Sequence, residues 1–190
     1  MLSWLFVQEK AYKSALAQEK AIFRRQQNSL QGVIEVALLA KADKVYEVTS
    51  DAFRFISNVA QEPKLSLEAE RQLLTLELLR NKAPDYKRIQ LDYKHLLERY
   101  GIYNETIDLQ LSYAEFLAFH YQQKQAAIVF LKKCLEVEAS KFTKAKLKLK
   151  LADILTTQEQ FNRALVFYTQ VHSQIKNSTL AQQARFKSAK

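Results

Sequence analysis

The sequence predicts an all-α superhelical solenoid of antiparallel helix hairpins. Only 2 Gly and 2 Pro occur in 190 residues, while 48% of the residues are hydrophobic. An average chain of this length carries roughly 13 Gly and 9 Pro. This shortage argues against turn-rich β folds and against folds with glycine-rich nucleotide-binding loops. The most frequent residues include Leu, Ala, Lys, Gln and Glu, which are good helix formers.

A repeat period supports the same fold class. Ala15, Ala127 and Ala164 each lie a few residues into an amphipathic helix that follows a short polar break. Ala127 and Ala164 are 37 residues apart, and Ala15 precedes Ala127 by 112 residues, close to three such periods. A period of about 20–50 residues is typical of helical solenoids. Because solenoids usually bind other molecules, the period favours binding over catalysis.

Breakers and caps mark the ends of the earlier helices. Asn28 and Ser29 separate the second helix from the third. Pro63 and Pro84 each lie in a polar break, since proline is tolerated at helix starts but not inside helices. Gly101 follows a basic last turn and suits the position just past a helix end.

The later helices begin at polar residues. Asn104 can cap the helix that follows it, and Thr156 with Glu159 three residues later fits a capping box. Asn177 and Ser178 mark the start of the last helix. Five hairpins with an unpaired last helix are therefore expected, in which sequence neighbours pack together because the loops are short. The expected helices cover residues 2–10, 12–27, 29–42, 44–61, 66–82, 86–100, 104–121, 123–138, 141–157, 159–176 and 178–190.

The residue pattern inside the hairpins resembles a known repeat. The clearest example has Phe161, Ala164, Tyr168 and Val171 at steps of three and four in a second helix. This pattern resembles the tetratricopeptide repeat (TPR), in which a small residue lets two helices approach while large residues fill the gaps. The glycine of the family's first helix is replaced here by Ala, Glu or Ser, and the terminal proline is missing. The hairpins over 29–61 and 66–100 match only in length and periodicity.

The resemblance implies a right-handed superhelix whose groove, lined by the first helices, binds a protein or peptide. The chain is also similar to the repeat region of large bacterial TPR proteins that carry an export signal upstream. That similarity favours the periplasmic side of the cell envelope, with the cytoplasm as the alternative. We expect one repeat domain over residues 1–190, belonging to a longer protein, because both ends of the sequence lie within helices.

Positive charge is concentrated near the end of the chain. Residues 141–190 hold 10 basic and 2 acidic residues, which gives +8 of the net +9. On a helix, Lys141, Lys144 and Lys148 fall on one side, and Lys146 and Lys150 fall on the opposite side. This helix either forms an electropositive surface for nucleic acid, anionic lipid or an acidic partner, or it is a solvated helix whose lysine stems cover apolar surface.

The sequence carries no signature of catalysis. Cys134 is the single cysteine, which excludes an intrachain disulfide and a multi-cysteine metal site. His95, His120 and His172 are far apart and lack ligand-spaced partners. No phosphate loop, nucleophile elbow or HExxH motif occurs. We therefore predict a non-enzyme without cofactor, metal or small-molecule substrate. No apolar run approaches the length of a transmembrane helix.

The TPR frame maps the groove onto fixed positions of the first helices. A groove with aromatic residues and a basic end suits an amphipathic or acidic-aromatic peptide. The alternative is that Trp4, Phe116 and Phe119 belong to the core. The partner-binding residues predicted in this way are Trp4, Phe116, Phe119, His120, Lys146, Lys150, Asp153 and Thr157.

Three functions are compatible with these patterns. The first is a scaffold that binds a protein or peptide in a pre-formed groove, which limits the entropy lost on binding. The alternative is a nucleic-acid-binding repeat that uses the basic C-terminal quarter. Base-reading solenoids repeat their readout residues, whereas the mapped positions here differ chemically from one another. The third is a structural spacer without a saturable ligand. The unpaired last helix also predicts self-association through that end.

Overall fold

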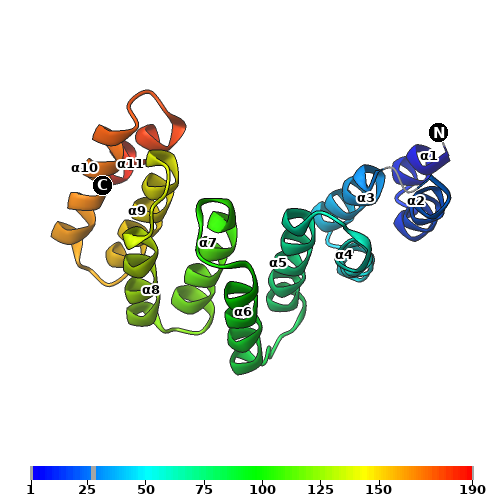
Figure 1. Cartoon of the computed structure of the whole chain (residues 1–190), viewed down its shortest axis with the longest axis horizontal. Coiled ribbons are helices and arrows are strands. Elements are labelled where there is room, and N and C mark those ends of the chain that lie inside the picture. The colour runs from blue at the N-terminus through cyan, green and yellow to red at the C-terminus, as the bar shows by residue number, and fades with distance from the viewer. Residues whose placement is uncertain (1, 27–28, 190) are drawn as a thin grey trace. The chain divides into compact units, whose positions relative to one another are not determined.

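The computed structural model describes residues 2–26 and 29–189, which form eleven α-helices and no strand (Figure 1). The predicted helices are confirmed, and their ends agree with the structure to within three residues when the π-helical turn over Phe116–His120 is counted with the helix that precedes it. The predicted break at Asn28 lies outside the described residues. The helices are α1 (Leu2–Gln8), α2 (Tyr12–Gln26), α3 (Gln31–Ala42), α4 (Tyr46–Val59), α5 (Pro63–Arg80), α6 (Tyr86–Tyr100), α7 (Ile107–Glu115), α8 (Lys124–Glu136), α9 (Lys141–Thr156), α10 (Phe161–Gln174) and α11 (Thr179–Ser188).

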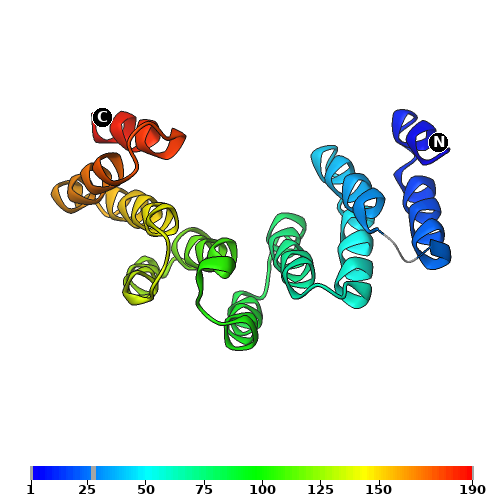
Figure 2. The same cartoon turned by 45° about the horizontal axis from the view of Figure 1, so that its top comes forward.

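The chain divides into two compact units, residues 1–84 with α1 to α5 and residues 85–190 with α6 to α11. Within each unit, helices that follow one another in sequence pack side by side, as α3 does with α4 and α9 with α10 (Figure 2). That both units act as one repeat domain stays a prediction. None of the described helices is both long and apolar enough to span a membrane.

A recurring turn joins the two helices of a hairpin. Four such turns contain a non-glycine residue with φ near 60°: Lys10, Lys44, Gln122 and Glu159. This left-handed residue ends the first helix and redirects the chain. The residue five positions later is small and at most 2% exposed in every case: Ala15, Thr49, Ala127 and Ala164. The turn therefore sets the register of the repeat, and Thr49 extends the alanine pattern into the hairpin of α3 and α4.

The capping predictions have mixed outcomes. Ser178 accepts a hydrogen bond from the Ala181 backbone N–H, so α11 begins as expected. Gly101 lies at the end of α6 with φ of 75°, also as expected. The capping box of Thr156 and Glu159 is wrong, because Glu159 adopts the left-handed conformation in the turn and α10 starts without a side-chain cap.

Asn104 also differs from its expected role. It begins a short 3₁₀ turn over residues 104–106, and Tyr103 stands at the cap position. The Oδ1 atom of Asn104 instead accepts hydrogen bonds from the Ser140 backbone N–H at 3.2 Å and from the Thr143 hydroxyl at 2.6 Å. Asn104 therefore ties the start of one hairpin to the start of the next.

A π-helical turn over Phe116–His120 extends α7. The Tyr121 N–H donates to the Phe116 carbonyl at 2.9 Å, a step of five residues. This wider turn leaves three consecutive side chains, Phe116, Leu117 and Ala118, no more than 2% exposed. Because α4 also buries three consecutive residues, Val48 to Ser50, without a π turn, the burial pattern does not predict the turn.

The C-terminal unit contains a buried aromatic cluster. Phe116 lies 5.3 Å from Tyr93 of α6, measured between ring centroids. Tyr113 of α7 meets Phe130 of α8 edge-on at 4.9 Å. Such offset and edge-to-face pairs are favourable beyond the area they bury. The cluster fixes the π turn between α6 and α8.

Candidate partner-binding faces

Three charged residues share one side of α9. Lys146, Lys150 and Asp153 follow one another at steps of four and three residues, so they project from one face of the helix. The opposite side of α9 is built into the core, where Leu147, Leu151 and several other apolar residues are fully buried. The helix is thereby held at a fixed rotation, and its polar face is fixed with it.

Each charge on this side of α9 pairs with a neighbouring helix. The Lys146 ammonium lies 3.7 Å from the Asp108 carboxylate, and the Lys150 ammonium lies 3.0 Å from the Glu115 carboxylate, both on α7. Asp153 receives two hydrogen bonds of 2.7 Å from Lys187 of α11. We call this surface the α9 face: Asp108, Glu115, Lys146, Lys150, Asp153 and Lys187.

Tyr168 of α10 supports the α9 face from behind. Its hydroxyl donates to Asp153 at 2.8 Å and lies 3.3 Å from the Thr156 hydroxyl. Burial and the nearby Asp153 carboxylate raise the pKa of Tyr168 to about 12. The phenol therefore stays protonated at neutral pH and holds Asp153 in place.

For Lys146 and Lys150, the structure favours the second of the two interpretations, in which the lysine stems cover apolar surface. Their side chains are 31% and 24% exposed, and each has a carboxylate partner. Lys146 also lies over the ring of Phe142, 5.5 Å from its centroid. The stems of these lysines cover apolar surface while the charged ends reach α7. The charge count along the sequence includes these lysines, but it does not show which carboxylates face them in the folded chain.

Lys144 and Lys148 border the buried stripe of α9, and Lys148 keeps its positive charge there. The Lys148 ammonium donates a hydrogen bond to the Gln174 side-chain carbonyl at 3.1 Å. No carboxylate pairs with this ammonium among the described residues. Burial and the neighbouring Lys144 lower its pKa. The side chains of Lys144 and Lys148 are both half-buried.

The remaining predicted residues differ in their exposure to solvent. Phe116 is 1% exposed inside the aromatic cluster, so it is a core residue and the prediction that it contacts a partner is wrong. Phe119 is 39% exposed and His120 is exposed, both on the π turn. Thr157 follows α9 and is exposed; its carbonyl accepts a hydrogen bond from Lys124 at 3.0 Å. Trp4 is 61% exposed in the N-terminal unit. No contact in the structure tests whether these exposed residues bind a partner, so for Phe119, His120, Thr157 and Trp4 this stays a prediction.

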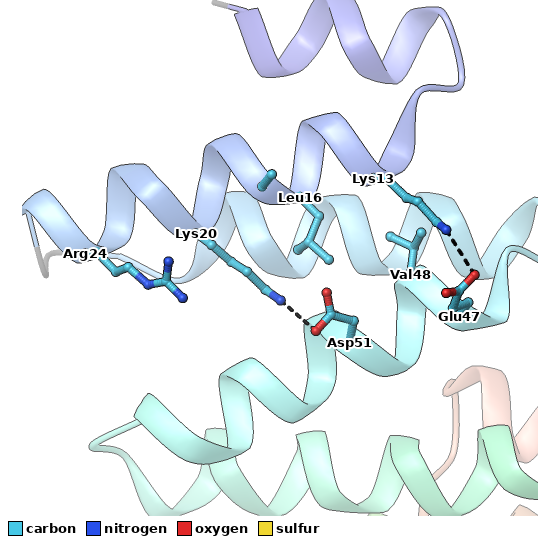
Figure 3. Close-up of a pocket in the computed structure, with 8 residues that line it drawn as sticks. Lys13, Leu16, Lys20, Arg24, Glu47, Val48 and Asp51 are labelled. Atoms are coloured by element: carbon cyan, nitrogen blue, oxygen red, sulfur yellow. Dashed lines mark ion pairs between the residues drawn. The ribbon is translucent and has the colours of Figure 1, made fainter.

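A cleft of about 420 Å³ lies between α2 and α4 in the N-terminal unit (Figure 3). Lys13 pairs with Glu47 at 3.2 Å and Lys20 with Asp51 at 2.8 Å, and the two ion pairs cross the cleft. Leu16 lies with Val48 on the floor, each no more than 3% exposed. We call this feature the α2–α4 cleft; its lining residues are Lys13, Leu16, Ala17, Lys20, Arg24, Glu47, Val48 and Asp51.

Solved structures with the same arrangement of helices are numerous. A thermophilic TPR protein of Thermus thermophilus has a TM-score of 0.65 at 12% identity, covering 99% of this chain and 94% of its own. BtubC from P. vanneervenii has a TM-score of 0.71 at 10% identity, with 99% and 82% covered. YrrB, described as a TPR protein with an unusual peptide-binding site, has a TM-score of 0.53 at 13% identity, with 97% and 88% covered. The fold is a TPR fold. No protein-family model and no curated protein sequence matches the chain.

The TPR frame assigns the two surfaces to different helices of the repeat. The α9 face belongs to α7 and α9, the first helices of their hairpins, and to the unpaired last helix α11. The α2–α4 cleft belongs to second helices. The groove expected from the resemblance is lined by first helices; that the α9 face forms part of such a groove stays a prediction.

Sequence reasoning missed the ion pairs, although a signal for them exists. Lys150 and Glu115 are 35 residues apart, close to the TPR repeat period. The cleft pair of Lys13 and Glu47 is separated by 34 residues. Opposite charges one repeat apart meet when consecutive hairpins stack, and a search at that spacing would have found them.

The single thiol of the chain is buried. Burial raises the pKa of the Cys134 thiol to about 12, which keeps it protonated and unreactive. In the described part of the chain, no group of three or more His, Cys, Asp or Glu side chains is placed to hold a metal ion. The polar groups of the α9 face are engaged in ion pairs and hydrogen bonds with one another.

Proposed function

We propose that this TPR chain is a non-catalytic scaffold that binds a protein or peptide on the α9 face. The proposal rests on one observation. A row of charged side chains on α9 is held in place by ion pairs with α7 and α11. A rigid, pre-formed face loses little conformational entropy on binding. YrrB, a TPR protein with an unusual peptide-binding site, shares the fold and supports a peptide as the ligand class.

The ion pairs of the face suit exchange with a partner. Lys146 and Asp108 are separated by 3.7 Å, and the Asp108 side chain is 63% exposed. Such exposed pairs contribute little stability, so a carboxylate of the partner can replace Asp108 at Lys146 at small cost. The half-buried lysine stems keep both ammonium groups in position. We therefore expect a ligand with carboxylates spaced to meet Lys146 and Lys150.

The test is affinity capture from a nuclease-treated extract at moderate salt. The bait proteins are the wild type, the face variant Lys146→Ala/Lys150→Ala, and the control variant Lys132→Ala/Lys133→Ala. The control removes the same charge from exposed positions of α8. Circular dichroism first establishes that all three baits are folded.

We expect a protein that the wild type and the control retain and the face variant loses. A protein retained equally by all three baits would place the binding surface elsewhere. Loss of all bound material on nuclease treatment would replace the proposal with nucleic-acid binding. A chain that retains nothing in a saturable way would be a structural spacer.

A further inference from the structure

The α2–α4 cleft is lined by one more basic than acidic side chain. Its α2 wall carries Lys13, Lys20 and Arg24, and its α4 wall carries Glu47 and Asp51. Lys13 and Lys20 are each paired with one of these carboxylates. Arg24 is exposed, and no carboxylate pairs with it in the part of the chain that the structure describes. The cleft therefore holds one excess positive charge, located at Arg24.

An aromatic ring of α4 holds this charge in a defined place. The Arg24 guanidinium carbon lies 5.7 Å from the centroid of the Phe55 ring, and the Lys20 ammonium lies 5.2 Å from the same centroid. Phe23 meets this ring edge-on at 5.7 Å. Figure 3 shows the Arg24 and Lys20 side chains leaving α2 next to each other. Like charges one helical turn apart repel each other, so an anion placed between them would be stabilised by both.

The neighbouring acids leave room for such an anion. The Asp51 carboxylate lies 2.8 Å from the Lys20 ammonium, but the Asp51 side chain is 64% exposed whereas that of Lys20 is 14% exposed. The lysine is thus fixed and its partner is solvated. Glu62 lines an adjoining groove together with Arg24, yet no ion pair joins the two among the described residues.

The cleft is lined by aliphatic carbon between its two ion pairs. Leu16 and Ala17 of α2 lie opposite Val48 of α4 in this stretch (Figure 3). The ion pairs of Lys13 and Lys20 cross the cleft seven residues apart, which is about 10 Å along a helix. A polypeptide running along the cleft would have to break both pairs. Since clefts of roughly 300–1,000 Å³ hold small ligands, the volume of about 420 Å³ favours a small molecule.

We propose that the α2–α4 cleft binds a small monocarboxylic acid with an apolar body. The carboxylate would lie between Arg24 and Lys20, because the guanidinium fork suits a carboxylate and one negative charge balances the excess positive charge. The apolar body would lie over Leu16 and Val48. Leu16 precedes Lys20 by one helical turn, about 6 Å along the axis, which sets the distance between the carboxylate and the apolar body. The site is separate from the α9 face and does not rest on partner binding there.

The test uses 4-phenylbutyrate as the probe, titrated into the full ¹⁵N-labelled chain at pH 7 and followed by NMR. Acetate supplies the carboxylate without the body, and 4-phenylbutyramide supplies the body without the charge. The dipeptide acetyl-Phe-Glu-amide offers the same two groups as side chains of a polypeptide. For a probe of this size we expect a dissociation constant on the order of 1 mM, with shifts concentrated in α2 and α4. Acetate and the amide should each bind at least about fivefold more weakly.

Neighbouring arginines provide a matched pair of variants. Arg24→Gln should weaken binding of 4-phenylbutyrate at least about fivefold, because a charged hydrogen bond is lost. Arg25→Gln removes the same charge from the next exposed residue of α2, which does not line the cleft, and should change the affinity less than about twofold. Asp51→Asn removes the competing carboxylate and should tighten binding. Circular dichroism establishes that each variant is folded, and Arg24→Lys, which keeps the charge, replaces Arg24→Gln if that variant unfolds; it should bind between the wild type and Asp51→Asn in neither direction by more than about threefold.

Four results would overturn the proposal. The first is the absence of saturable shifts in α2 and α4. The second is equal binding of 4-phenylbutyrate and its amide, and the third is equal weakening by Arg24→Gln and Arg25→Gln. Tighter binding of the dipeptide would be the fourth, since it would replace the small acid with a segment of a partner protein. Lys146→Ala/Lys150→Ala should leave the affinity for 4-phenylbutyrate unchanged; its loss in that variant would place the acid on the α9 face instead.

Discussion

The repeat register makes a sharp prediction at Ala127. This residue lies five positions after the left-handed Gln122, is completely buried, and sits where α8 packs against α7 and its π turn. Replacing it with Leu adds three carbon atoms at a site with no exposed surface. Overpacking of this kind typically costs about 1–3 kcal/mol, because neighbouring side chains or the backbone must shift.

The adjacent residue provides a matched control. Ala126 is exposed on the same turn of α8, so Ala126→Leu adds the same atoms outside the core. Leu and Ala have similar helix propensities, and surface substitutions usually change stability by no more than about 0.5 kcal/mol. The difference between the two variants therefore isolates the close approach of the helices from any effect on helix formation.

Urea denaturation followed by far-ultraviolet circular dichroism measures both variants. With a slope of about 2–3 kcal/mol per molar urea, a loss of about 2 kcal/mol lowers the midpoint by about 0.7–1 M. Because repeat proteins can unfold in more than one step, the comparison uses the first transition. If Ala127→Leu and Ala126→Leu had the same midpoint, the small residue would not mark a close approach, and the register defined by the turns would be wrong.

Two further predictions concern the C-terminal unit. Gly101 has φ of 75°, and a Cβ atom there would meet the ring of Tyr103, so Gly101→Ala should lower stability by about 1–3 kcal/mol; an unchanged melting temperature would contradict this assignment of strain. The pKa of Tyr168 is raised to about 12 from an ordinary value of 10, so its stabilising contribution is complete below pH 10 and is lost as the pH rises towards 12. This shift corresponds to about 2–3 kcal/mol. The measured quantity is the free energy of unfolding of the wild type minus that of Tyr168→Phe, from urea denaturation at several pH values, and it should fall by that amount as the pH rises from 10 to 12. A difference that does not change with pH would show that Asp153 and burial do not perturb the phenol.

Local chemistry allowed the helices themselves to be predicted. Few glycines and prolines interrupt the chain, so those present fall at boundaries: Pro63 is the first residue of α5 and Gly101 ends α6. The π turn was not predictable in the same way. Its residue Phe116 packs against aromatic rings such as that of Tyr93 on α6, which are distant in sequence.

The candidate site was predicted only in part. Helical periodicity alone places Lys146, Lys150 and Asp153 on one face of α9, and that they bind a partner stays a prediction. For Phe116 the sequence left open both the groove and the core, and its packing against Tyr93 of α6 decided for the core. The Asp108 and Glu115 partners were missed because composition was summed along the chain, whereas stacking brings residues one repeat apart into contact.

The sequence by itself determined that this protein is a helical repeat, because helix propensity, capping and a spacing of 37 residues are all properties of short segments. It did not determine which charges and apolar groups remain available to a partner. That depends on which hairpin covers which: α4 covers Leu16, while the equivalent Leu165 stays 46% exposed on α10. Burial and ion pairing are set by contacts between hairpins, so only the tertiary structure distinguished the paired lysines of the α9 face from the exposed apolar side chains of α10.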